Sequence, residues 1–146
     1  MHVLVLRFSA MGDVAMAVPA MYSLLKENPE LKITFLSRPF FEPLFQFSNR
    51  IHFVGADLKN QHKGVLGLKR LSQQIIKDNQ FDAVVDIHNV LRTKILRRFL
   101  KLKGLNISVF DKGRKEKEAL INGSKFKKLS HSTQLYLDAF SKLGLK

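Results

Sequence analysis

The sequence predicts an α/β domain in which a mostly parallel sheet carries helices on both faces, a Rossmann-like arrangement. Short apolar runs of strand length alternate along the whole chain with stretches of helical periodicity. The strand-like runs are apolar almost throughout and rich in β-branched residues, as strands covered on both faces are. The chain has 146 residues, 45% of them apolar, which is enough for one domain with a sizeable core. We therefore expect residues 1–146 to form a single domain.

The first half of the chain predicts three strands and two helices. The run HVLVLRF predicts a buried strand, and apolar residues at helical spacing follow the segment SAMGD. Pro19 falls within the first two turns of this helix, so a distortion or a late helix start is expected there. The expected elements are a strand at 2–8, a helix at 13–28, strands at 31–37 and 50–55, and a helix at 65–79.

The second half continues the alternation of strand and helix. The expected elements are a strand at 81–87, a helix at 89–103, a strand at 105–110, and a helix at 132–143 that Gly144 ends. Helix 89–103 is predicted to be amphipathic and basic, since its apolar residues share one side and its Lys and Arg residues lie elsewhere. In parallel sheets ligands bind beyond the carboxyl ends of the strands. The loops of interest are therefore 8–13, 37–39, 88–92 and 111–115.

The formal net charge is +13, and it is concentrated in one quarter of the chain. Residues 92–128 contain 13 Lys and Arg against 3 Asp and Glu. This asymmetry predicts an anionic partner, which could be nucleic acid, an anionic membrane surface or a phosphorylated substrate. A solvated basic face without a specific partner is the other interpretation.

Cysteine is absent, which fits a reducing compartment and excludes disulfides and thiolate metal sites. The N-terminal segment MHVLVLRFSAMGD lacks a basic leader, and its apolar run is too short for a signal peptide or a membrane span. We expect a cytoplasmic protein. Within any one element, His, Asp and Glu do not occur at metal-ligand spacing, so no metal site is predicted.

The loop FSAMGD between the first strand and the first helix is the most informative segment. A dinucleotide-binding fold would have G-x-G-x-x-G here, but Gly12 is the only glycine, which disfavours a Rossmann-type oxidoreductase. Gly12 permits a tight turn with close backbone approach, Ser9 supplies a hydroxyl, and the helix start supplies N–H donors. These features suit recognition of an anion or a hydroxyl group.

Asp13 has two interpretations that are compatible with each other. Aspartate is a preferred N-cap residue and complements the positive end of the helix dipole. A carboxylate in a loop at a strand end is also fixed in direction and can accept a proton from a bound hydroxyl group.

Three further groups are candidates for ligand contacts. His88 follows the strand 81–87 and is either a ligand contact or a structural histidine. Arg92, one turn into the basic helix, could bind a phosphate or carboxylate through two hydrogen bonds, or be one more solvated charge. Lys112 and Arg114, around Gly113, could capture phosphate or belong to a plain exposed loop.

Four segments of the chain, in the same order, resemble glycosyltransferase family 9, whose members include the heptosyltransferases of the lipopolysaccharide inner core. They are VLVLRFSAMGDVAMAVPAMYSLLKENPELKITFLSRP, FDAVVDIHNVLRTKILRR, FDKGRKEKEAL and HSTQLYLDAFSKLGL. The family opens with a strand ending in Arg, then Ser-x-x-Gly-Asp, a helix carrying a Pro, and a second strand. The resemblance covers essentially the whole chain.

This resemblance implies one half of a GT-B glycosyltransferase, in which two Rossmann-like domains face each other across a cleft. The N-terminal half receives the acceptor, and the C-terminal half, absent from this chain, binds the nucleotide sugar. An isolated N-terminal domain, inactive alone, is therefore expected. Asp13 matches the general base of an inverting transfer, and Ser9 and Gly12 match the loop that shapes the acceptor pocket.

The same resemblance implies the partners. The donor would be a nucleotide sugar, of ADP-heptose type, bound mainly by the missing domain, and no other cofactor is expected. The acceptor would be a lipopolysaccharide core or a related anionic molecule, with His88, Arg92, Lys112 and Arg114 as candidate contacts. The basic segment would also place the protein peripherally on the inner membrane, since each Lys or Arg near an anionic surface contributes about 1 kcal/mol.

Two other functions are compatible with parts of the sequence. A basic α/β domain that binds nucleic acid accounts for the charge, but it requires aromatic residues interleaved with the basic ones, and residues 92–128 contain only three Phe. A self-contained nucleotide-binding module is the third possibility. It is the least favoured, since the chain has no G-x-x-x-x-G-K-[ST] pattern.

Overall fold

The computed structural model describes residues 1–111 and 125–145, with side chains described up to 111 and from 133. Lys112 and Arg114 lie outside the described residues. In the part of the chain that is described, no helix has both the length and the apolar character needed to cross a bilayer.

The core of the fold is a five-stranded parallel sheet, as the sequence predicts. The strand order is β3-β2-β1-β4-β5, so β1 lies at the centre and the chain reverses direction of winding between β3 and β4. The strands are β1 (His2–Leu6), β2 (Lys32–Ser37), β3 (Ile51–Gly55), β4 (Ala83–Asp86) and β5 (Asn106–Val109). Because every pairing is parallel, all five carboxyl ends lie along one edge of the sheet.

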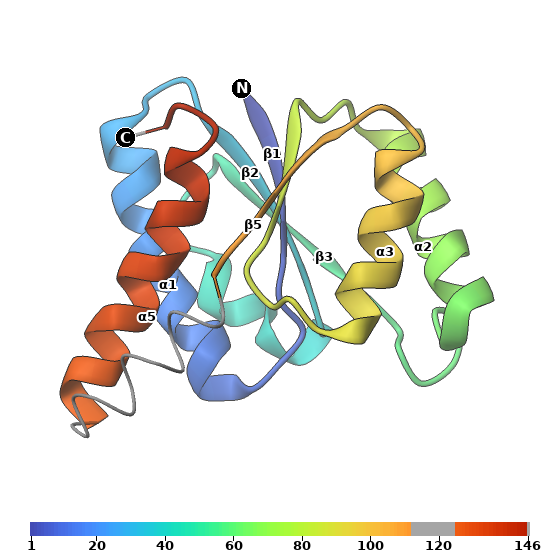
Figure 1. Ribbon diagram of the computed structural model, residues 1–146, viewed down its shortest axis with the longest axis horizontal. Coiled ribbons are helices and arrows are strands. Elements are labelled where there is room, and N and C mark those ends of the chain that lie inside the picture. Colours follow the sequence, from blue (N-terminus) through green and yellow to red (C-terminus); the bar gives the residue numbers. More distant parts are fainter. Residues whose placement is uncertain (112–124, 146) are drawn as a thin grey trace.

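Helices cover both faces of this sheet (Figure 1). They are α1 (Met11–Glu27), the 3₁₀ helix η1 (Pro39–Phe45), α2 (Gly64–Asp78), α3 (Leu91–Lys101) and α5 (Lys125–Ser141). In Figure 1, α1 and α5 lie side by side on one face, and α2 and α3 lie side by side on the other. The fold is therefore the doubly covered α/β arrangement that the alternating sequence pattern predicts.

The two faces have separate cores because side chains alternate along each strand. In β1, Val3 and Val5 pack in the core beneath α1 and α5. Leu4 and Leu6 of the same strand pack in the core beneath α2 and α3. This central strand is therefore apolar from Val3 to Leu6, and Arg7, which follows it, is the first Lys or Arg residue on its path.

Several predicted boundaries differ from the observed ones. Helix α1 begins at Met11, two residues earlier than expected, and runs through Pro19, so the late start was wrong. Its N-cap residue is Ala10, and Asp13 is the third helical residue, so the prediction of an Asp13 N-cap was also wrong. Helix η1 was not predicted, and α5 begins at Lys125 and not at 132.

Candidate active site at the carboxyl edge

The loops that follow β1 and β4 meet at the carboxyl edge of the sheet because the two strands are neighbours. The backbone N–H of Phe8 donates to Nδ1 of His88 across 3.2 Å and ties the two loops together. The β1 loop carries Ser9 and Gly12 as well, so Asp13, Ser9, Gly12 and His88 share one region of the molecule. The grouping of these four residues was predicted from their position after strand ends.

Asp13 forms an ion pair with Arg7 at this edge. Arg7 Nη2 lies 2.9 Å from Asp13 Oδ2. The Arg7 side chain is only 7% exposed, whereas the Asp13 side chain is 36% exposed. The cation is therefore enclosed in the protein, and the carboxylate that it holds can be reached from solvent.

Arg7 is fixed by a second contact and retains one donor without a partner. Its Nη1 donates to the backbone carbonyl of Ile87, 2.9 Å away, in the β4 loop. Within the described residues, Arg7 Nε and the hydroxyl of Ser37 are buried and have no hydrogen-bonding partner. Both residues lie at carboxyl ends of neighbouring strands, so unsatisfied polar groups gather next to the ion pair.

Tyr136 connects this region with α5. Its hydroxyl donates to the backbone carbonyl of Asp13 at 3.4 Å, and its ring meets Phe110 edge-on. Burial is the main cause that raises the pKa of Tyr136 to about 12, with the Asp13 carboxylate adding to the effect and the Arg7 guanidinium opposing it. The neutral phenol is thus favoured beside the ion pair.

Gly12 and Ser9 lie in the segment that leads to Asp13. Gly12 is exposed in the first turn of α1, and a Cβ atom at this position would meet no atom within 4 Å. Its φ is not positive, so the predicted role in a tight turn is not needed for the backbone of this helix. Open space at Gly12 instead leaves the helix N-terminus accessible, where backbone N–H groups attract anions. Ser9 is half-buried in the preceding loop.

His88 belongs to a network that shapes the β4 loop. Asp86 Oδ1 accepts from the backbone N–H groups of His88 and Asn89, each at 2.8 Å. Asp86 Oδ2 pairs with Nη1 of Arg97 at 3.0 Å. Asn89 has a φ of 54°, the left-handed conformation that this tight loop requires. The buried His88 ring, which accepts the Phe8 N–H, fits the structural interpretation of this residue.

Arg92 lies apart from the other candidates. It is the second residue of α3 and is exposed. The structure does not bring it into hydrogen-bonding contact with the β1 loop among the described residues. Lys112 and Arg114 lie outside the described residues.

Sequence reasoning missed four residues that organise the site: Arg7, Asp86, Arg97 and Tyr136. For Arg7 and Asp86 a signal was present, because each is a charged residue at the end of an apolar strand. Such a charge is buried only when it is paired. For Tyr136 there was none, since its contact with Asp13 spans 123 positions of sequence.

Exposed apolar residues occur in the segments that follow the first four strands. They come from four different loops and helix starts: Met11, Phe40, Val65, Leu66 and Leu91. In the part of the chain that is described, no three His, Asp or Glu residues form a group that could hold a metal ion.

The fold matches that of solved glycosyltransferase structures, whereas comparison of the sequence with known families finds no match. Neither a family model nor a curated protein matches the chain. Among solved structures, a family 9 glycosyl transferase from Veillonella parvula matches with a TM-score of 0.71 and 18% identity, over 99% of this chain and 42% of its own length. The E. coli heptosyltransferase WaaC, solved with ADP-2-deoxy-2-fluoro heptose, matches with a TM-score of 0.67 and 14% identity, over 97% of this chain and 49% of its own length.

A third solved structure also matches. A UGT transferase from Siraitia grosvenorii, in complex with UDP, has a TM-score of 0.54 and 18% identity, over 75% of this chain and 27% of its own length. The domain therefore has the Rossmann-like fold of one half of a GT-B glycosyltransferase. More closely, it has the fold of family 9 glycosyltransferases. The chain spans less than half the length of each of these three structures.

Proposed function

We propose that this chain is the acceptor-binding half of an inverting glycosyltransferase, with Asp13 as the general base. The acceptor hydroxyl would lie at the carboxyl edge, beside Asp13. Its oxygen attacks the anomeric carbon of a nucleotide sugar as the bond from that carbon to the nucleoside diphosphate breaks. Asp13 accepts the hydroxyl proton, and the diphosphate leaves with the bonding electron pair.

The observation that carries the proposal is the opposite burial of the two partners in the Arg7–Asp13 pair. A carboxylate that serves only as the partner of a buried cation would be expected to be enclosed with it, but Asp13 stays 36% exposed. It is held through one oxygen by a guanidinium that is itself held by Ile87. A carboxylate is a weak base toward a hydroxyl group, so the contribution of Asp13 depends on its position.

The proposed donor is a sugar nucleotide of the ADP-heptose type, and the proposed acceptor is an anionic lipopolysaccharide core. The heptosyltransferase fold of WaaC and the sequence resemblance to family 9 support this choice. The excess of Lys and Arg supports an anionic acceptor, with Ser9, Gly12 and Arg92 as proposed contacts and His88 as a residue that shapes the loop. The donor would be bound by a second domain, and the chain alone would transfer no sugar.

Acceptor binding can be tested on this chain alone. A ¹⁵N-labelled sample is titrated with a deacylated lipopolysaccharide core oligosaccharide, and backbone amide shifts are followed by NMR. The proposal predicts the largest shifts in residues 9–13 and 87–92. Shifts confined to the amino edge of the sheet, or none at millimolar oligosaccharide, would contradict it.

Catalysis requires a donor domain. In a chimera, this chain replaces the matching N-terminal half of WaaC, and heptose transfer from the nucleotide donor to the core acceptor is measured. The proposal predicts activity in the chimera and its loss in the Asp13→Asn chimera. An Asp13→Asn chimera as active as its parent would show that Asp13 is not the base.

A further inference from the structure

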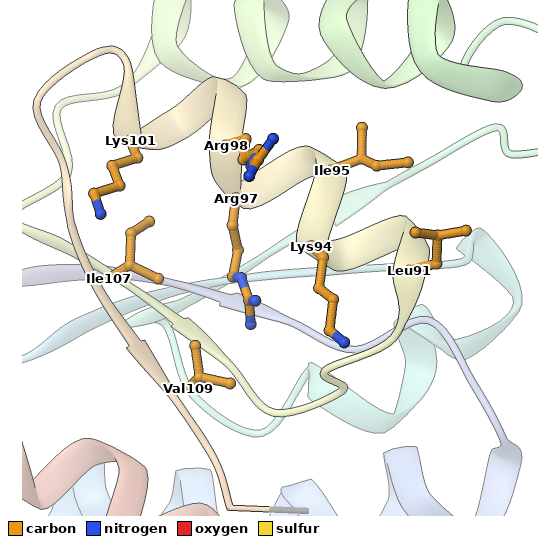
Figure 2. Close-up of a pocket in the computed structure, with 8 residues that line it drawn as sticks. All are labelled: Leu91, Lys94, Ile95, Arg97, Arg98, Lys101, Ile107 and Val109. Atoms are coloured by element: carbon orange, nitrogen blue, oxygen red, sulfur yellow. The ribbon is translucent and has the colours of Figure 1, made fainter.

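Two hollows of the molecule differ in their lining. A groove of about 620 Å³ lies between α3 and β5, where Figure 2 shows Lys and Arg side chains beside aliphatic ones. A cavity of about 340 Å³, which we call the amino-edge cavity, lies where β1, β2 and β3 begin, at the edge of the sheet opposite to Asp13. Its lining contains one aliphatic residue, Ile33, and is otherwise polar. The amino-edge cavity is therefore suited to a polar ligand.

The parallel register brings the polar side chains of this cavity together. Lys32 lies beside His2 on the neighbouring strand, and Thr34 lies beside His52. Because alternate side chains of a strand share one face, all four lie on the face of the sheet that α2 and α3 cover. Nε2 of His2 is 2.7 Å from the hydroxyl oxygen of the fully buried Thr34. Asn79, which follows the end of α2, closes the cavity on the helix side.

Positive charge gathers at the amino-edge cavity. Lys32, Arg50 and His52 line it, and among the described residues no Asp or Glu does. Arg50 donates to four backbone carbonyl groups at the end of α1 and in the loop that follows, which anchors its charge here. In the described part of the chain, Lys32 has no carboxylate within the 4.0 Å of an ion pair. Lys32 and His52 are exposed, so both can donate to a ligand.

The charges at this edge act on one another. Burial is the main cause that lowers the pKa of His2, and the charges of Lys32 and His52 lower it further. A hydrogen bond with the backbone of Gln80 and the carboxylate of Asp82, which accepts the backbone N–H of His2 at 2.7 Å, act in the opposite direction. The cationic groups therefore lie close enough to repel one another, and an anion in the cavity relieves this repulsion.

A second hollow, of about 650 Å³, adjoins the amino-edge cavity and shares His52 and Asn79 with it. Its lining includes the amide of Gln74 and the carboxylate of Asp78. Nδ1 of His62 accepts a backbone N–H, so Nε2 carries the proton and donates to Oε1 of Gln74 at 2.8 Å. The NH₂ group of Gln74 is left for other partners. Amide and carboxylate groups together can donate to and accept from hydroxyl groups.

We propose that the amino-edge cavity binds the phosphate group of a phosphorylated sugar or polyol. The Lys32 ammonium and the His52 imidazole donate to the phosphate oxygens, and the charge of Arg50 adds to the attraction. Hydroxyl groups of the ligand reach Gln74 and Asp78 in the adjoining hollow. The volume of about 340 Å³ lies at the lower end of the range of small-molecule sites, which suits a phosphate group with a few carbon atoms.

This site takes no part in the proposed sugar transfer. Asp13 and the acceptor lie at the carboxyl edge, and the phosphate lies at the amino edge. The proposal therefore does not rest on the proposed function.

The experiment uses the ¹⁵N-labelled 146-residue chain and three probes: glucose 6-phosphate, inorganic phosphate and glucose. Backbone amide shifts are followed by NMR at millimolar concentrations of each probe. The proposal predicts the largest shifts at residues 2, 32–34, 50–52 and 79 with both phosphates and none with glucose. Glucose 6-phosphate should bind several-fold more tightly than inorganic phosphate, because only the sugar phosphate has hydroxyl groups for the adjoining hollow.

Two variants and a matched control test the named contacts. Lys32→Met and His52→Leu should each weaken the binding of glucose 6-phosphate by about 10-fold or more, since each removes a donor to a charged group. Lys59→Met makes the same change as Lys32→Met at an exposed position after the carboxyl end of β3, and it should bind as the wild type does. Circular dichroism establishes that each variant is folded.

Five outcomes would overturn the proposal. They are no binding of either phosphate, equal shifts with glucose, equal affinity for the two phosphates, equal loss in Lys32→Met and Lys59→Met, and shifts that are largest at residues 9–13, where the N-terminus of α1 can attract an anion. Asp13→Asn should bind glucose 6-phosphate as the wild type does. The phosphate site and the proposed function therefore fail independently.

Discussion

Two arginine–aspartate pairs lie at the carboxyl ends of neighbouring strands, and their burial is reversed. After β1, Arg7 is buried and Asp13 is exposed. After β4, Asp86 is fully buried and Arg97 is 20% exposed. The two carboxylates therefore have different surroundings, although each is within 3.0 Å of a guanidinium nitrogen.

The difference favours a structural role for the Asp86–Arg97 pair and supports the proposed chemical role of Asp13. Asp86 uses its two oxygens for two backbone N–H groups and Arg97, which fixes the loop 87–90. A buried carboxylate with such partners has no access to a substrate. Asp13 is paired with the buried Arg7 guanidinium and is itself open to solvent. A proton acceptor needs such access to a bound hydroxyl group.

The largest effect is expected from Asp13→Asn, measured as kcat in the chimera with a donor domain. The amide keeps the size of the side chain and an oxygen for Arg7, but it cannot accept the proton. Loss of a general base lowers kcat by about 10²- to 10⁴-fold. Unfolding of the isolated variant in urea should change by no more than about 1 kcal/mol, since the position is partly solvated.

The matched control is Asp138→Asn, at a position that contacts Gln134 on the surface of α5. It should leave kcat and stability unchanged. If Asp13→Asn instead unfolds the chain and the small amount of folded variant retains full kcat, Asp13 resembles Asp86 and the distinction between the pairs is lost.

The second effect concerns stability and the other pair. Asp86→Ala removes the acceptor of two buried N–H groups and the partner of Arg97. Breaking a buried ion pair from one side costs about 3–5 kcal/mol. Urea denaturation followed by circular dichroism measures it, and a loss below 1 kcal/mol would contradict the assigned role of Asp86.

The alternation of apolar runs with helical periodicity was sufficient to predict the parallel sheet and the helices on both faces. Strands that are buried on both faces are continuous apolar runs, whereas strands with one exposed face alternate apolar and polar residues. The alternation could not predict η1, since Pro39 and Pro43 interrupt helical periodicity. The start of α1 was missed because Ala10 has no capping side chain.

The candidate site was predictable only where it depends on local sequence. Position after a strand end is a property of the local sequence, and it placed Asp13 and His88 in loops at the carboxyl ends of strands. The partners of a buried charge depend on the tertiary fold. Arg7 reaches Ile87 across 80 positions, so neither the Arg7–Asp13 pair nor its reversed burial could be read from spacing.

The third prediction compares the same substitution in the two pairs. Arg97→Met leaves the fully buried Asp86 carboxylate without its cation, and it should destabilise the protein by about 3–5 kcal/mol. Arg7→Met leaves Asp13, which water can solvate, and the methionine side chain fills the buried space, so the cost should be about 1–3 kcal/mol, mainly from the buried Ile87 carbonyl that loses its donor. Equal losses in urea denaturation would refute the reversed-burial argument.

Arg7→Met should nonetheless lower kcat in the chimera by about 10-fold with KM little changed, because Arg7 acts through the position of Asp13. Arg7→Lys keeps the cation and should restore part of this loss. A purely structural role for Arg7 would leave kcat unchanged in the folded variant.

The smallest effect uses Tyr136 as a reporter of the Arg7–Asp13 pair at alkaline pH. Its pKa is raised to about 12 in the folded protein, from 10.0. The folded state therefore holds the phenolic proton more tightly than the unfolded state does. The stability that this shift contributes is complete below pH 10 and is lost as the pH rises toward 12, by about 2 kcal/mol.

Urea denaturation of the wild type and Tyr136→Phe between pH 8 and 12 isolates this contribution, because the loss of lysine charges is common to both proteins. The wild type should lose more stability than the variant across this interval, whereas Tyr22→Phe, at an exposed position of α1, should follow the wild type. The Arg7 guanidinium opposes the rise in the Tyr136 pKa, so Arg7→Met should raise this pKa further. The alkaline loss of stability that depends on Tyr136 should therefore be larger in the Arg7→Met protein than in the wild type. If stability falls with pH equally in the proteins with Tyr136 and with the Tyr136→Phe substitution, the Arg7–Asp13 pair does not affect the ionisation of Tyr136. Helix α5 would then contribute packing alone to the carboxyl edge.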